Sequence, residues 1–170
     1  MISFEQLLPG HWPQVKAIYL EGIKTGNATF ETSAPEWEEW NKAHVESCRL
    51  VAKVNDEVAA WAALTAVSGR CVYAGVGEVS VYVAEKFRGQ GIGKQLLKKL
   101  IEASEENPQD AAHNFWTLQA GIFPENISSI KIHESLGFKI IGKHERIGKM
   151  HGVWRDTLLL ERRSEKVGVD

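Results

Sequence analysis

The fold is decided by one stretch of the sequence, Val81-Tyr82-Val83-Ala84-Glu85-Lys86-Phe87-Arg88-Gly89-Gln90-Gly91-Ile92-Gly93-Lys94. Residues 78–83, which lead into it, alternate between β-branched and other side chains and predict a strand. Residues 91–105 carry apolar side chains at helical spacing and predict a helix. Glycines at alternate positions between them let a ligand approach the backbone, and the helix dipole favours an anion. The stretch therefore predicts a phosphate or pyrophosphate site.

Spacing excludes the two common nucleotide motifs. A dinucleotide-binding GxGxxG needs a third glycine at position 94 or 96, where the chain has Lys94 and Leu96. A P-loop needs glycine at position 88 and serine or threonine at position 95, where Arg88 and Gln95 stand. The alternative without a ligand is a glycine turn that merely tightens a strand–helix junction.

Outward from this stretch, strands and helices are interspersed along the chain. Apolar spacing predicts helices at residues 9–22, 91–105 and 128–136, and Ser33-Ala34-Pro35-Glu36 predicts the start of a short helix with Trp37 and Trp40. A tight turn at 55–57 joins the first two of six strand-like runs, 50–54, 58–64, 78–83, 115–122, 138–142 and 157–160. Hairpins at both ends predict an α/β or α+β fold around one mixed sheet.

Composition limits the class of protein and its partners. The chain has 170 residues, 44% apolar and 25% charged, which is typical of a soluble globular domain. Its net charge of −2 creates no global field that attracts nucleic acid or an anionic membrane. The longest apolar run, from Val58 to Leu64, is far shorter than the roughly twenty residues of a membrane span. We therefore expect neither nucleic acid nor membrane as a partner.

Cysteine and histidine usage bears on compartment and metal binding. Cys48 and Cys71 form no CxxC pattern, and residues 1–5 lack the basic start and apolar stretch of a signal peptide. Both observations predict a cytoplasmic protein with reduced thiols. We expect no metal, because metal-binding spacing is missing among His11, His44, His113, His144 and His151.

Two motifs resemble those of the Gcn5-related N-acetyltransferase (GNAT) superfamily. Residues 88–93 match its (Q/R)xxGx(G/A) motif, and residues 126–138 resemble its second motif, NxxAxxxYxxxGF. Three flanking segments resemble the phosphinothricin N-acetyltransferase branch, which acetylates small amino-acid-like amines: residues 26–32, 78–83 and 151–156.

The resemblance implies the GNAT fold, in which a central mixed, mostly antiparallel twisted sheet is splayed at the cofactor site and flanked by about four helices. It implies a single domain over residues 1–163, a flexible C-terminal tail at 164–170 and a homodimer.

The same resemblance implies acetyl-coenzyme A as co-substrate. Pantetheine would pair with the strand backbone around Tyr82, at Val81 and Val83, and would contact Asn126 and Ser129. The pyrophosphate would bind the turn formed by Arg88, Gly89, Gln90, Gly91, Ile92 and Gly93. Asn126 can instead cap the following helix, or do both. Lys94, Lys98 and Lys99 form either a solvated helix face or, in part, a contact to the adenosine 3′-phosphate.

Acetyl transfer to an amine requires proton transfer, because an ammonium group has no lone pair. Glu78 opens the central strand, and His133 lies two helical turns past Asn126. Much of the superfamily has tyrosine at the position of His133, whereas phosphinothricin-type members carry histidine. The role of His133 stays open between acid and base. The alternatives are a solvated strand-end carboxylate for Glu78 and a structural histidine for His133.

Acceptor recognition is expected from the loop that holds Phe30, Glu31 and Thr32, which matches the substrate-wrapping segment of the branch. Arg70, Tyr73 and Trp154 are weaker candidates, and Arg70 either pairs with a carboxylate or lies in solvent. The other tryptophans considered, Trp37, Trp40 and Trp61, are expected in the core.

The sequence therefore predicts a cytoplasmic N-acetyltransferase for a small amino-acid-like amine of the phosphinothricin, methionine sulfone or methionine sulfoximine type, by direct attack on the thioester. One alternative is acetylation of a peptide or protein amine, which an acidic open groove would favour. Another is a non-catalytic acyl-CoA-binding module, and the presence of both Glu78 and His133 argues against it.

Overall fold

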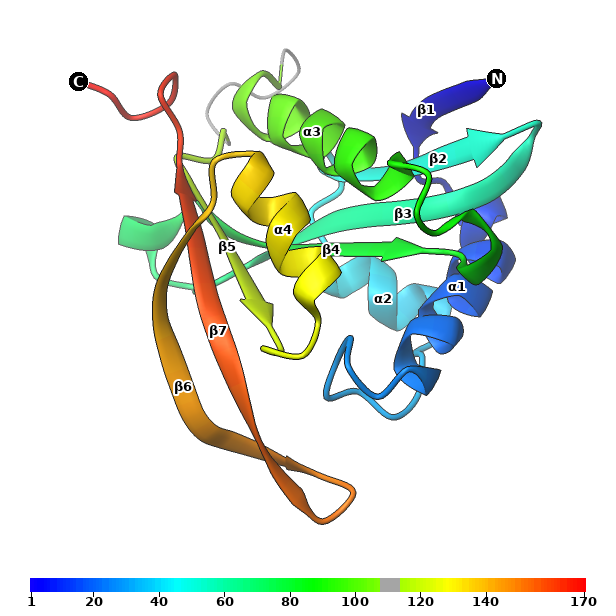
Figure 1. Ribbon diagram of the computed structural model, residues 1–170. Coiled ribbons are helices and arrows are strands. Elements are labelled where there is room, and N and C mark those ends of the chain that lie inside the picture. The colour runs from blue at the N-terminus through cyan, green and yellow to red at the C-terminus, as the bar shows by residue number, and fades with distance from the viewer. Residues whose placement is uncertain (108–113) are drawn as a thin grey trace.

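The computed structural model describes residues 1–107 and 114–170 (Figure 1). Its α-helices are α1 (Trp12–Lys24), α2 (Trp37–Ala43), α3 (Ile92–Glu105) and α4 (Ile127–Ser135). Its strands are β1 (Ile2–Gln6), β2 (Arg49–Val54), β3 (Glu57–Ala66), β4 (Val76–Val83), β5 (Thr117–Ile122), β6 (Lys139–Met150) and β7 (Val153–Arg163). Short 3₁₀ turns are η1 (Pro9–His11), η2 (Cys71–Tyr73) and η3 (Glu85–Phe87).

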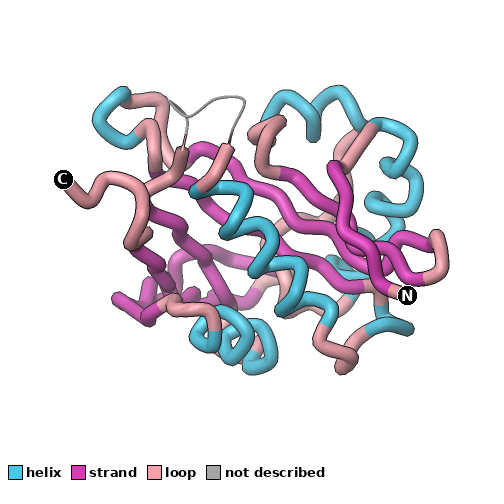
Figure 2. The backbone as a smooth tube through the Cα atoms, turned by 90° about the horizontal axis from the view of Figure 1, so that it is seen from above, coloured by secondary structure: helices cyan, strands magenta, loops and turns pink. Residues whose placement is uncertain are grey.

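The strands form one seven-stranded sheet in the order β1-β2-β3-β4-β5-β7-β6. Every neighbouring pair is antiparallel except β4 and β5. Helices α1 and α2 cover one face, and α3 and α4 cover the other (Figures 1 and 2). Along β3, Trp61 and Ala63 pack on the α1 side, and Ala62 and Leu64 pack on the α3 side. The expected mixed, mostly antiparallel sheet between helices is confirmed.

Most of the expected elements are present, and the differences concern short or exposed segments. Edge strand β1 is missing from the prediction because it is only five residues long and its apolar face carries just Ile2 and Phe4. Strands β6 and β7 run well beyond the expected 138–142 and 157–160. Their outer halves form a hairpin that projects from the body of the protein (Figure 1), so burial imposes little apolar alternation on them.

Helix α2 begins later than expected. Its N-cap is Glu36, in an extended conformation, and not Ser33. The stretch from Ser33 to Glu36 continues the preceding loop because the residue before a proline disfavours the helical conformation, and Pro35 stands in it. The hairpin between β2 and β3 agrees with expectation, and Asn55 and Asp56 take the positive φ angles of a tight turn.

The centre of the sheet opens between its two parallel strands. Pairing of β4 with β5 ends at Glu78 and Gln119, whereas β4 stays paired with β3 as far as Val83. The N–H of Ala84 donates to Ala59 O on the β3 side at 2.8 Å. Because successive residues of a strand direct their backbone groups to opposite edges, those of Val81 and Val83 face the open side. The described residues place no strand against this edge.

A stack of aromatic rings connects α1 to the open strand. The Tyr82 ring lies parallel to Trp61 at 4.7 Å between centroids and meets the edge of Tyr19 at 5.0 Å. Helix α1 approaches this stack through Gly22, where an added Cβ would lie 2.6 Å from the Tyr82 ring. The absence of a side chain at this position therefore sets how closely α1 packs on β4.

Gly22→Ala is expected to destabilise the protein by about 1–3 kcal/mol, because the stacked Tyr82 ring has no room to move. Gly10→Ala is the matched control, since no atom lies within 4 Å of a Cβ built there. Thermal unfolding of both variants tests the close packing, and equal melting temperatures would contradict it.

Candidate active site

The turn between β4 and α3 is a cluster of unpaired backbone donors. Gly89 and Gly91 have φ angles of +76° and +77°, a left-handed conformation that favours glycine. Gly93 allows α3 to approach β4, since a Cβ there would lie 3.0 Å from Val83. Within the described chain the N–H groups of residues 89–94 have no hydrogen-bond partner. This turn is therefore suited to an anion such as a pyrophosphate.

Side chains of the turn fold back on its own backbone. Arg88 Nε donates to Val83 O at 3.2 Å, and Gln90 Nε2 donates to Lys86 O at 3.2 Å. Arg88 thus covers one carbonyl of the open β4 edge. The lysines of α3 are exposed, as expected of a solvated face, and Lys99 pairs with Glu102 at 2.9 Å.

Helix α4 brings the second motif to the same side of the sheet. Asn126 is its N-cap, and its Oδ1 accepts a hydrogen bond from Ser129 N at 3.4 Å. His133 is 4% exposed, and its Nδ1 lies 2.7 Å from Ser129 O. Because a carbonyl only accepts, Nδ1 carries the hydrogen, and neutral His133 has its lone pair on Nε2. Burial lowers the pKa of His133 and favours this neutral form.

Glu78 stands where β4 and β5 separate. The surrounding protein raises the pKa of its carboxyl group by desolvation, although the side chain keeps contact with solvent. By strand alternation Glu78 shares the α1 face with Ser80 and Tyr82, whereas His133 belongs to the α4 face. No hydrogen bond joins Glu78 and His133 in the described chain. The two groups flank the opening from opposite faces.

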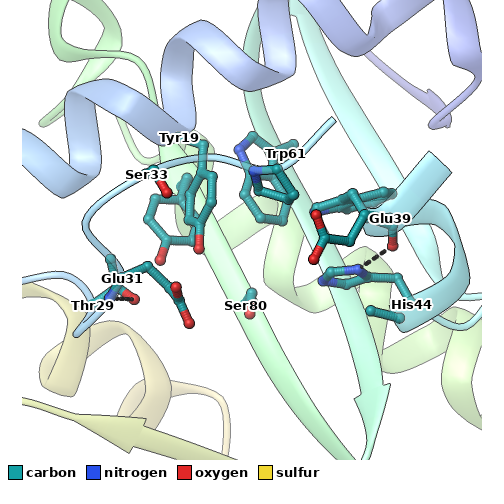
Figure 3. Close-up of a pocket in the computed structure, with 12 residues that line it drawn as sticks. Tyr19, Thr29, Glu31, Ser33, Glu39, His44, Trp61 and Ser80 are labelled. Carbon is teal, nitrogen blue, oxygen red and sulfur yellow. Dashed lines mark hydrogen bonds between the residues drawn. The ribbon is translucent and has the colours of Figure 1, made fainter. Parts of the chain in front are cut away.

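A cleft of about 340 Å³ opens on the α1 face beside this opening (Figure 3). It is lined by Tyr19, Thr29, Glu31, Ser33, Pro35, Glu39, Trp40, Ala43, His44, Trp61, Ser80 and Tyr82. Glu31 enters from the segment 25–36, here named the acceptor loop, and Glu39 enters from α2 (Figure 3). The lining contains two carboxylates, several hydroxyl groups and no lysine or arginine.

The phenols and the histidine of the cleft are held in their neutral forms. Burial raises the pKa of Tyr82 and of Tyr19, and the Glu31 carboxylate adds to both shifts. His44 stacks on Trp40 with ring centroids 4.0 Å apart, and its Nδ1 lies 2.7 Å from Trp40 O. Burial lowers the pKa of His44. The cleft therefore offers neutral hydrogen-bonding groups beside two acidic residues.

The expected acceptor residues divide between cleft and periphery. Glu31 lines the cleft, whereas Phe30 packs on the Phe123 ring at 4.8 Å between centroids. Thr32 is exposed and does not line the cleft. Arg70 and Tyr73 lie together near η2, 5.4 Å from guanidinium carbon to ring centroid, and neither lines the cleft. Trp154 lines a separate hollow between the tip of the projecting hairpin and the segments that hold Gly26, Asn27 and Glu125.

Several residues that line the cleft were not predicted from the sequence. Tyr19 fits the expected helix stripe and Ser80 shares the face of Glu78, so both carried a weak signal. Glu39 and His44 carried none, since their place depends on how α2 packs. Trp40 and Trp61 are buried as expected, and they also line the cleft.

The described residues hold neither a cluster of metal ligands nor a helix that could span a membrane. No group of three histidine, cysteine, aspartate or glutamate side chains gathers there as a metal site would require. His113 lies outside the described residues. Within those residues, no helix has the length and apolar character needed to cross a bilayer.

Comparison with known proteins agrees with this geometry. The model of the acetyltransferase (GNAT) family matches residues 12–138. Phosphinothricin N-acetyltransferase of Alcaligenes faecalis is 31% identical over 157 residues, which cover 88% of this chain and 76% of that protein. An L-methionine sulfoximine/L-methionine sulfone acetyltransferase of Pseudomonas paraeruginosa is 36% identical over 89 residues, 52% of this chain and 48% of that protein.

A solved GNAT superfamily phosphinothricin acetyltransferase from Sinorhizobium meliloti, in complex with AcCoA, has a TM-score of 0.83 at 26% identity. The alignment covers 99% of this chain and 91% of that one. The resemblance inferred from the two motifs is confirmed, and the chain belongs to the acetyltransferase (GNAT) family.

Proposed function

We propose that the protein transfers the acetyl group of acetyl-coenzyme A to the amine of a small amino-acid-like substrate, of the phosphinothricin, methionine sulfone or methionine sulfoximine type. One observation carries the proposal: the unpaired β4 edge leads directly into a turn of free N–H groups, beside a cleft that reaches the same strand. The substrate class rests on the activities named for the relatives. We further propose a cytoplasmic homodimer whose chain has one domain over 1–163 and a flexible tail at 164–170.

Backbone groups supply most of the proposed cofactor site. The open edge at Val81 and Val83 offers N–H and C=O groups to the pantetheine amides, as a missing strand would. The pyrophosphate binds the free N–H groups of residues 89–93, with Lys94 close by, whereas the expected donor at Arg88 is already used, since its N–H donates to Glu85 O at 3.3 Å. Arg88 Nε already donates to Val83 O, and the second lone pair of that carbonyl oxygen is available to a pantetheine amide. The side-chain nitrogen of Asn126 takes no part in the helix cap, and together with Ser129 it can contact the pantetheine arm.

Glu78 and His133 are proposed to carry out different proton transfers. Acetyl-coenzyme A supplies the thioester. Glu78 faces the cleft side and takes the proton from the ammonium group, directly or through water; its raised pKa makes it a stronger base than an ordinary carboxylate. His133 lies on the cofactor side, where its unprotonated Nε2 takes the second proton that the attacking amine loses and passes it to the leaving thiolate; its lowered pKa makes the imidazolium formed in this way a stronger acid.

Acceptor binding follows from the charges of the cleft. Glu31 and Glu39 attract the ammonium group, and neutral hydroxyl donors are available for the oxyanion end of the substrate. Two carboxylates without a basic partner also favour a second candidate, acetylation of a peptide amine. Arg70 stays a prediction as a carboxylate-binding residue.

A thiol-release assay with a panel of amines tests the substrate class. Phosphinothricin, methionine sulfone and methionine sulfoximine are expected to be turned over faster than spermidine, kanamycin and short peptides. Turnover of a polyamine, an aminoglycoside or a peptide well above every amino acid would overturn the proposed class.

Gly91→Val tests the cofactor turn. The substitution strains a backbone with φ +77° and blocks close approach of the pyrophosphate, so coenzyme A affinity should fall about tenfold or more, or about 1.4 kcal/mol. Gly152→Val is the control, because it imposes similar strain at φ +80° in the turn between β6 and β7. Calorimetry should show unchanged coenzyme A affinity for the control; unchanged affinity for both removes the pyrophosphate assignment.

Glu78→Gln and His133→Phe test the proton transfers. Each is expected to lower kcat by about a hundred- to ten-thousand-fold while coenzyme A binding persists. If both variants keep near-wild-type kcat, neither residue moves the proton.

The pH dependence separates the two groups. Both must be unprotonated at the start of a cycle, so kcat/KM falls as pH is lowered. In His133→Phe the remaining acidic limb reports Glu78, with a midpoint above the ordinary 4.5. In Glu78→Gln it reports His133, with a midpoint below the ordinary 6.5. Midpoints displaced the opposite way would contradict these assignments.

A further inference from the structure

Arg155 of β7 joins the acceptor loop to the rest of the site. Its Nη1 donates to Gly26 O at 2.9 Å, and its Nη2 donates to Asn27 Oδ1 at 2.8 Å. The same Nη2 lies 3.3 Å from Glu125 Oε2. Although the strand belongs to the projecting hairpin, the Arg155 side chain is only 14% exposed. One guanidinium group thus connects three segments that are distant in sequence.

Aromatic rings add a second set of contacts between Arg155 and the acceptor loop. The guanidinium carbon of Arg155 lies 4.2 Å from the centroid of the Phe123 ring, which in turn meets the edge of Phe30. On its other side Phe30 packs on β6, where a Cβ added to Gly148 would lie 2.8 Å from the ring. The acceptor loop is therefore held at its start by hydrogen bonds and at its middle by ring packing.

We propose that Arg155 is a positioning residue that holds the acceptor loop over the cleft and in a fixed position relative to the start of α4. The inference rests on the proposed assignment of the cleft to the acceptor. Thr29 and Glu31 line the cleft only a few residues after Asn27, so movement at Asn27 displaces both. Glu125 directly precedes the helix cap, so its carboxylate gives the guanidinium a fixed anchor beside the start of α4.

The planar shape of arginine is required for this role. Two hydrogen bonds in a fork, an ion pair and a face stacked on Phe123 cannot all be made by a lysine ammonium group. Arg155 does not line the cleft, and it acts only through the loop it holds. Loss of this contact should therefore weaken acceptor binding and leave coenzyme A binding intact.

Steady-state kinetics with L-methionine sulfone and phosphinothricin test the inference. Arg155→Gln should raise the acceptor KM about tenfold, with the coenzyme A Kd unchanged, and Arg155→Lys should recover only part of the loss. Asn27→Ala should raise KM less and should add nothing to Arg155→Gln, because both variants break the same contact. A merely structural role would lower the active fraction, and with it kcat, at constant KM.

Arg146→Gln is the matched control. Arg146 lies in the same hairpin with its guanidinium 5.6 Å from the Trp154 ring, and its side chain makes no hydrogen bond to the acceptor loop in the described residues. Its acceptor KM should stay within twofold of wild type. An unchanged KM in Arg155→Gln, or an equal loss of coenzyme A affinity, would overturn the inference.

Amide hydrogen exchange tests the contact between Arg155 and the acceptor loop without any acceptor present. Residues 25–33 should exchange faster in Arg155→Gln than in wild type, and at the wild-type rate in Arg146→Gln. If wild type acetylates no amino acid, the proposed substrate class fails and the exchange rates alone decide the role of Arg155. Equal exchange in all three proteins would overturn that role.

Discussion

The end of hydrogen bonding between β4 and β5 is the constraint on which the rest of the site depends. Strand pairing stops at Glu78 and Gln119, so the backbone groups of Val81 and Val83 face an edge without a protein partner. Buried backbone groups require hydrogen bonds, and a ligand with amide groups satisfies them where a strand is missing. The same separation brings the free N–H groups of residues 89–94 beside that edge. One break in one ladder thus creates both halves of the cofactor site.

In the proposed mechanism, the break also separates the acidic and basic roles of the reaction. Glu78 belongs to the cleft face and His133 to the opposite face, and burial acts on both. Because burial disfavours charge, the pKa of the carboxyl group rises and the pKa of the imidazole falls. Both shifts move the two pKa values toward each other. A carboxylate that accepts a proton more readily and an imidazolium that releases one more readily are what amine deprotonation and thiolate release require.

Sequence reasoning succeeded where one local requirement determines structure. The glycine turn at 88–93, the strand at 78–83 and the helix at 91–105 each follow from a local sequence pattern, and each was predicted. The prediction from the sequence was incomplete where the structure depends on packing between segments that are distant in the chain. Strand β6 is exposed along most of its length and lacks alternation, and Glu39 and His44 reach the cleft only because α2 packs on Trp61. The cofactor half of the site is therefore visible in the sequence, and most of the cleft is not.

This difference follows from how each half makes its contacts. In the proposed site the cofactor is held mainly by backbone groups, so few side chains matter there beyond the glycines that permit the turn. In the same proposal the acceptor meets side chains from the acceptor loop, α2 and β4, and the loop is held by Arg155 and by the packing of Phe30. Substitutions at Glu31 or Glu39 can therefore change which amine is bound without disturbing the turn. Selectivity in this acetyltransferase can change independently of its cofactor chemistry, because no hydrogen bond in the described residues ties the glycine turn to the acceptor loop.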